Sequence, residues 1–84
     1  MAKHEKLLQR ILLGKSDSSV SFEDLRNLLI YLGFVERIRG GHHIFVKEGV
    51  MDLINLQRDK KMAKAYQVRQ VRSVIVQYGL GGKK

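Results

Sequence analysis

Apolar residues recur with a helical period in three separate stretches of the chain. The first stretch predicts a short amphipathic helix over residues 3–13, because four apolar residues share one helical face: Leu7, Leu8, Ile11 and Leu12. Gly14 follows at a position that favours a left-handed backbone at a helix end. The polar run 15–19 after it is typical of a linker.

The second stretch carries the clearest helix signals, over residues 22–32. Its apolar stripe follows the i, i+3, i+4, i+7 pattern: Leu25, Leu28, Leu29 and Leu32. Ser21 is a good N-cap with Asp24 three residues later, close to a capping box, and Val20 can pack on Leu25 as a hydrophobic staple. Gly33 is expected to end the helix, with Phe34 folding back on Leu29 as in a Schellman motif.

The third stretch predicts a helix from about residue 65 to residue 78. Its core face is marked by four residues at i, i+3, i+7 and i+10: Val68, Val71, Ile75 and Tyr78. Gly79 ends this helix, and residues 81–84 are expected to form a disordered tail.

Between the second and third helices the apolar pattern changes to that of strands. Residues 34–39, 42–47 and 50–56 are predicted strands, joined by two-residue turns at Gly40-Gly41 and Glu48-Gly49. Connections this short make the sheet antiparallel. The order is α-α-β-β-β-α, an α+β fold in which the two longer helices cover one face of a three-stranded sheet and the other face stays open for a partner.

The net charge of the chain indicates which kinds of partner it can bind. The chain of 84 residues carries 16 Lys and Arg against 8 Asp and Glu, a formal net charge of +8. Such a charge attracts polyanions. RNA, DNA, an anionic membrane or an acidic protein would satisfy it, and the basic residues could also serve solubility alone.

Other features exclude several classes of protein. The chain has no cysteine, so disulfides and thiolate metal sites are excluded. No apolar run approaches the roughly 20 residues that span a bilayer, and the first residues do not resemble a signal peptide. We therefore expect a cytoplasmic protein without membrane association. No P-loop, no G-x-S-x-G and no paired-carboxylate signature appears.

The candidate chemistry lies at Gly40-Gly41-His42-His43. Glycines let a ligand backbone approach closely, and histidine is well suited to proton transfer near neutral pH. The two histidines are adjacent on a strand, so they point to opposite faces and cannot share one metal ion. We expect no metal and no small-molecule cofactor. One histidine should face the helices and the other the open face, but alternation alone does not say which.

Basic residues around the last helix are candidates for phosphate binding. Lys60, Lys61 and Lys64 lie just before this helix, where point charges and the helix dipole combine to hold an anion. Arg69 and Arg72 are one turn apart and could extend the basic patch. The alternative for such a run is a solvated surface without a ligand.

Taken together, these features resemble the HicA toxin family over about residues 20–80. The similarity rests on Leu32-Gly33-Phe34 after a helix, a charged strand, Gly40-Gly41-His42-His43-Ile44-Phe45, a third strand, and a closing helix through Tyr78-Gly79-Leu80. It implies a core domain of double-stranded-RNA-binding-domain-like α-β-β-β-α fold over residues 20–80, with residues 1–19 as an added helix and linker.

The resemblance also implies a function. HicA toxins are messenger RNA interferases that a HicB antitoxin neutralises, and their Gly-Ser-His motif contains the catalytic histidine. By position, Gly40 and His42 match the motif, and Gly41 stands where the family has serine. The run 60–64 also resembles the lysine motif of double-stranded-RNA-binding domains.

Two functions therefore remain in view. The first is a metal-independent endoribonuclease that cleaves messenger RNA with His42 and binds RNA through seven further residues: Gly40, Gly41, Lys60, Lys61, Lys64, Arg69 and Arg72. The alternative is a non-catalytic RNA-binding domain that uses the same surface. A DNA-binding domain is a weaker third reading, because the apolar stripe of the last helix is better used as core.

Overall fold

The computed structural model describes residues 2–58 and 61–80. Its elements in chain order are α1 (Ala2–Leu13), a short 3-10 helix η1 (Asp17–Ser19), α2 (Phe22–Tyr31), β1 (Val35–Arg39), β2 (His42–Lys47), β3 (Val50–Gln57) and α3 (Ala65–Tyr78). The expected α+β composition and element order are confirmed. The predicted tail, residues 81–84, lies outside the described residues.

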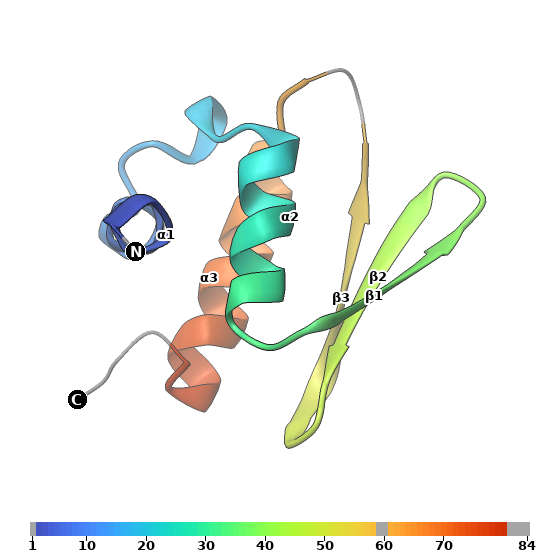
Figure 1. Cartoon of the computed structure of the whole chain (residues 1–84). Helices are drawn as coiled ribbons and strands as arrows, with labels where there is room; N and C mark the ends of the chain where they lie inside the picture. The colour runs from blue at the N-terminus through green and yellow to red at the C-terminus, as the bar shows by residue number, and fades with distance from the viewer. Residues whose placement is uncertain (1, 59–60, 81–84) are drawn as a thin grey trace.

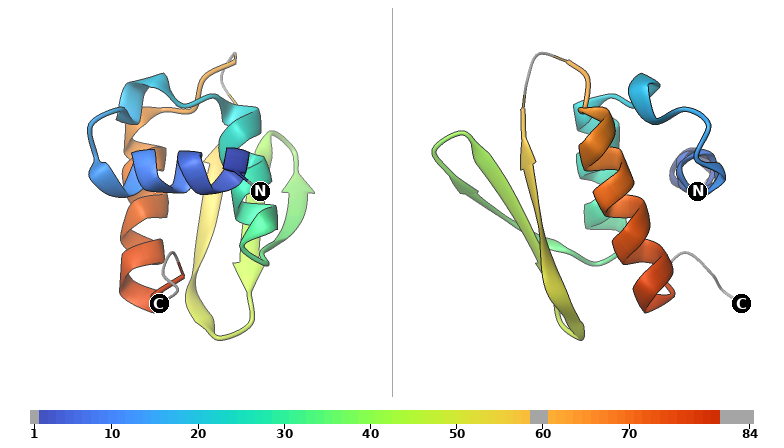
Figure 2. Two further views of the ribbon diagram at one scale, coloured as in Figure 1. Left: turned by 60° about the vertical axis from the view of Figure 1, so that its left-hand side comes forward. Right: turned by 180° about the vertical axis from the view of Figure 1, so that it is seen from behind.

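The elements stack in three layers (Figure 1). Helices α2 and α3 cover one face of the sheet, as the sequence predicts, and the opposite face of the sheet carries no other element of the described chain. Helix α1 lies across α2 and α3 on the side away from the sheet (Figure 2). The structure shows no helix, among the residues that it describes, that is long and apolar enough to cross a membrane.

The two ends of α2 form as their sequence signals predict. The Ser21 hydroxyl accepts a hydrogen bond of 3.0 Å from the Asp24 backbone N–H. At the other end, Phe34 N–H donates to the Leu29 carbonyl and Gly33 N–H to the Ile30 carbonyl, each at 3.0 Å. This is the Schellman pattern. Because the turn tightens there, the helix ends at Tyr31, one residue earlier than predicted, and Phe34 precedes β1 instead of opening it.

The sheet is antiparallel with the order β1-β2-β3. Its first hairpin pairs Arg39 with His42, and β2 pairs His42 with Gln57 of β3. The register between β2 and β3 shifts between Phe45 and Lys47. Strand β3 extends one residue beyond the prediction, to Gln57. That extra residue brings the end of β3 beside the histidine pair.

One hydrophobic core joins all three layers. Phe45, Ile54 and Leu56 from the sheet pack with the apolar faces of α2 and α3. Helix α1 contributes three buried residues to the same cluster: Leu7, Leu8 and Ile11. The N-terminal helix α1 is thus packed into the same core, and it covers the side of α2 and α3 that the sheet leaves free.

Candidate nucleic-acid interface

The turn between β1 and β2 is built by two glycines with different backbone requirements. Gly40 has φ of +59°, in the left-handed region, whereas Gly41 is not among the positive-φ glycines. A positive φ at the first central position fits a type II′ turn. A Cβ added at Gly41 meets nothing within 4 Å. Gly41 therefore has room for a side chain.

The structure assigns each histidine to one face of the sheet. His43 faces the helices: its ring lies edge-on to the Phe22 ring at 5.0 Å between centroids, and its side chain is 16% exposed. His42 is exposed and lies on the open face. The histidine that matches the family motif by position is thus the one that a ligand on the open face can reach.

Polar and basic side chains surround His42 on the open face. Directly paired residues share a face, so Arg39, His42 and Gln57 form one row across the three strands. The next row contains Arg37, Ile44 and Asn55. Asn55 also reaches diagonally to His42, with 3.3 Å between its Oδ1 and the histidine Nδ1.

The sequence-based set of RNA-binding residues does not include these neighbours of His42. Arg37 and Arg39 precede the glycine turn, and the hairpin register alone places Arg39 opposite His42. Asn55 and Gln57 could be found only by extending the pairing across β3, where the register shift obscures the pattern. Once His42 is known to face outward, the hairpin register identifies Arg37 and Arg39. The observed register of β2 with β3 then identifies Asn55 and Gln57.

His43 belongs to a charged cluster on the helix side of the sheet. Its Nδ1 lies 2.7 Å from Glu36 Oε2. The Arg26 Nε donates to both Glu36 oxygens at 2.9 Å. Hydrogen bonding from Arg26, reinforced by the bond to His43, holds the pKa of the Glu36 carboxyl below its ordinary value despite its burial. The cluster fastens the β1–β2 hairpin to α2.

The end of β3 is held against the start of α3 by Gln67. This side chain is 1% exposed. Its Nε2 donates to the Gln57 carbonyl at 3.4 Å, and its Oε1 accepts from the Lys64 N–H at 3.3 Å. The glycine turn and the start of α3 lie at the same end of the molecule (Figures 1 and 2). His42 is thereby brought to the same end of the molecule as Lys61 and Lys64.

The segment before α3 is anchored to the start of α2. The Phe22 N–H donates to the Lys61 carbonyl at 2.8 Å, and the Ala63 N–H donates to the Val20 carbonyl at 2.9 Å. The Lys61 side chain is exposed and that of Lys64 is partly buried. The predicted contact residue Lys60 lies outside the described residues.

Arg58 follows β3 directly, and its side chain packs against the start of α2. Its guanidinium contacts the Glu23 carboxylate and lies over the Phe22 ring, 4.9 Å from the ring centroid. Half of the side chain remains exposed. Arg58 is therefore paired with Glu23 beside α2, and part of its side chain is open to solvent.

The structure does not bring Arg72 to this surface. Its guanidinium donates to both oxygens of Asp17, at 2.8 and 3.1 Å, and to the Ile11 carbonyl at 3.1 Å. Arg69 also contributes to lowering the pKa of Asp17, after Arg72, so it lies on the same side of α3. Arg72 thus faces the α1 and η1 side of the helical layer, away from the open sheet face.

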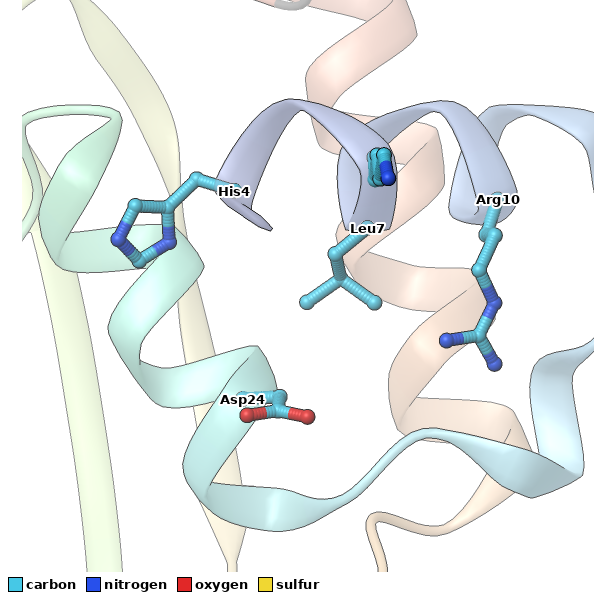
Figure 3. A pocket seen from close by; sticks show the side chains of 5 residues that line it. His4, Leu7, Arg10 and Asp24 are labelled. Atoms are coloured by element: carbon cyan, nitrogen blue, oxygen red, sulfur yellow. The ribbon is translucent and has the colours of Figure 1, made fainter. Parts of the chain in front are cut away.

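A pocket of about 260 Å³ lies between α1 and α2, away from the sheet. Figure 3 shows Leu7 and Arg10 extending from α1 and Asp24 on α2, on different sides of the pocket. Arg10 already donates to the Ser19 hydroxyl and carbonyl. In the described ranges, no group of three or more His, Cys, Asp or Glu is placed to hold a metal ion.

Comparisons with known proteins add nothing to these geometric observations. No protein-family model matches the sequence, no curated protein is detectably similar to it, and no solved structure matches its fold.

Proposed function

We propose that this chain is a metal-independent endoribonuclease that cleaves messenger RNA on the open face of its sheet. The observation that carries the proposal is the position of His42, exposed on that face in one row with Arg39 and Gln57. RNA cleavage without a metal needs a base for the 2′-hydroxyl proton, a proton donor for the leaving oxygen and a cation for the phosphorane. His42 and Arg39 supply the first and the last of these.

The reaction uses the 2′-hydroxyl of the RNA as nucleophile. The His42 imidazole takes the 2′-hydroxyl proton, the 2′-oxygen forms a bond to phosphorus, and the bond from phosphorus to the 5′-oxygen breaks. The leaving 5′-oxygen takes a proton from water, and the products are a 2′,3′-cyclic phosphate and a 5′-hydroxyl end. The Arg39 guanidinium, opposite His42 in the hairpin, stabilises the negative charge of the phosphorane.

The path of the RNA follows the basic residues at this end of the domain. From the row of Arg39 and His42 it passes the end of β3 at Gln57 and reaches Lys61 and Lys64 at the start of α3. Phosphates are favoured there by the lysine charges and by the N-terminal end of the helix dipole. In this proposal Arg69 and Arg72 are not part of the path, because Arg72 is bound to Asp17.

The double-stranded-RNA-binding-domain-like arrangement and the toxin role belong to the same proposal. Two helices on one face of a three-stranded antiparallel sheet agree with that arrangement. The sequence resemblance to HicA toxins supports a role in growth control and a HicB-like antitoxin as the protein partner. Expression of the chain should then arrest growth, and co-expression of the antitoxin should relieve the arrest.

One observation favours a second function, non-catalytic RNA binding. The carboxylate that commonly orients a catalytic histidine is bound here to His43, on the other face of the sheet, and His42 has an amide beside it instead. A binding module would use the same surface without cleaving, with binding that weakens steeply as salt rises.

The two functions are separated by cleavage assays on purified protein in the presence of EDTA. We expect the wild type to cleave single-stranded RNA and His42→Ala to lose roughly 100-fold or more of the rate. His4→Ala is the matched control, because His4 stacks on Tyr31 in the α1–α2 contact, far from the open face.

Circular dichroism verifies that each variant is folded. A folded His42→Ala protein that cleaves as fast as wild type would remove His42 from the reaction. Tight RNA binding by the wild type without any product would establish the binding module instead.

A further inference from the structure

Asn55 is the one residue whose side chain the structure places in polar contact with His42 among the described residues. It lies on β3 directly opposite Ile44, one row away from His42. Diagonal neighbours on one sheet face are within reach of longer side chains. The contact joins the amide Oδ1 of Asn55 to the Nδ1 of His42 over 3.3 Å.

This contact selects one tautomer of the histidine. An amide oxygen has lone pairs and no hydrogen, so it can only accept. The Nδ1 of His42 must therefore carry the proton for a hydrogen bond to form. In a neutral imidazole the other nitrogen, Nε2, is then the atom with the free lone pair.

We infer that Asn55 is a positioning residue that fixes the Nδ1–H tautomer of His42 and leaves Nε2 as its basic atom. This inference deepens the proposed function, on which its catalytic consequence rests: Nε2 is the atom that takes the 2′-hydroxyl proton. Asn55 does not itself touch the reacting atoms. It also limits rotation of the imidazole, so that the base keeps one orientation relative to Arg39.

The choice of an amide has a chemical consequence. A carboxylate at this position would also accept from Nδ1, but it would favour the charged imidazolium, which cannot act as a base. An amide orients the ring without adding charge. The histidine that does contact a carboxylate, His43, lies on the helix side of the sheet, where it helps to hold the hairpin.

The tautomer can be measured directly, without RNA. Nitrogen-15 NMR of the imidazole distinguishes Nδ1–H from Nε2–H through the separate shifts of the two nitrogens. We expect Nδ1–H as the main neutral form of His42 in the wild type, and a shift toward Nε2–H in Asn55→Leu. The matched control is Gln70→Leu, an exposed amide on α3, which should leave the His42 spectrum unchanged.

Kinetic measurements on Asn55 variants distinguish a positioning role from a role in folding alone. Asn55→Leu should lower kcat by roughly 10-fold with little change in KM, a size typical for loss of a group that orients a functional histidine. Asn55→Asp keeps the acceptor, so it should retain the Nδ1–H tautomer. Its added charge should move the acid limb of the pH–rate profile to higher pH.

The outcomes separate this inference from the proposed function. An Nε2–H tautomer in the wild type, or an unchanged tautomer in folded Asn55→Leu, overturns the role of Asn55 whether or not RNA is cleaved. The expected tautomer with no cleavage of any RNA by the wild type overturns the endoribonuclease and the catalytic part of the inference, and leaves the Asn55–His42 contact itself established.

Discussion

At the scale of single residues, the cluster of Arg26, Glu36 and His43 fixes the hairpin that presents His42. The Glu36 side chain is 10% exposed and is hydrogen-bonded on both oxygens. We expect Glu36→Gln to lower the free energy of unfolding by about 2 kcal/mol at pH 7, because it removes a charge-assisted pair that is largely shielded from water. Urea denaturation followed by circular dichroism measures this difference.

The stability difference between wild type and Glu36→Gln should depend on pH, and the sign of this dependence follows from the pKa of Glu36. The pKa of Glu36 in the folded protein lies below its ordinary value of 4.5, mainly because Arg26 donates to the carboxylate. The contribution of Glu36 to stability is therefore complete above pH 4.5 and is lost as the pH falls through the folded-state pKa. The stability gap between wild type and Glu36→Gln should close on acidification. A gap that stays constant down to pH 2 contradicts this account, and Glu48→Gln in the exposed β2–β3 turn is the control.

At the scale of elements, Arg72 connects three of them. From α3 its guanidinium binds Asp17 of η1 and the Ile11 carbonyl in α1. We expect Arg72→Met, which keeps the apolar stem and removes the guanidinium, to loosen α1 from α2 and α3. Hydrogen exchange should become faster in the amides of α1 while the amides of the sheet stay protected.

The control for this element is Arg69→Met, one turn earlier on α3 and exposed. It should leave exchange in α1 close to that of the wild type. Equal exchange in α1 for Arg72→Met and wild type would show that the buried residues Leu7, Leu8 and Ile11 hold the helix without the arginine.

The same elements show how far the sequence alone can lead. Local signals located the helix ends to within one residue, since Ser21, Gly33 and Gly79 act within one turn of themselves. Alternation also separated His42 from His43 correctly. Which histidine faces outward depends on packing against Phe22, a contact between residues 21 positions apart in sequence, and no local pattern encodes it. The ion pair between Arg72 and Asp17 also joins residues far apart in the sequence. No local pattern in the sequence therefore indicated that the charge of Arg72 is paired.

At the scale of the whole molecule, the two sides of the sheet have different roles. The helices fill one side, and α1 covers the outer side of α2 and α3 (Figure 2). The open face therefore offers His42 together with Arg37 and Arg39, in a chain whose net charge is +8. Of the histidines in the described residues, His42 is the one exposed on that face, since His43 packs against Phe22 and His4 stacks on Tyr31.

The central claim, that RNA binds across the open sheet face beside His42, is tested most directly by NMR mapping. The titrant is a 2′-O-methyl oligonucleotide, which lacks the nucleophile and stays intact. We predict that the largest shift changes fall on residues 37–42, on Asn55 and Gln57, and on Lys61 and Lys64. Changes concentrated on α1 and the outer side of α3, with the sheet unaffected, would contradict the claim.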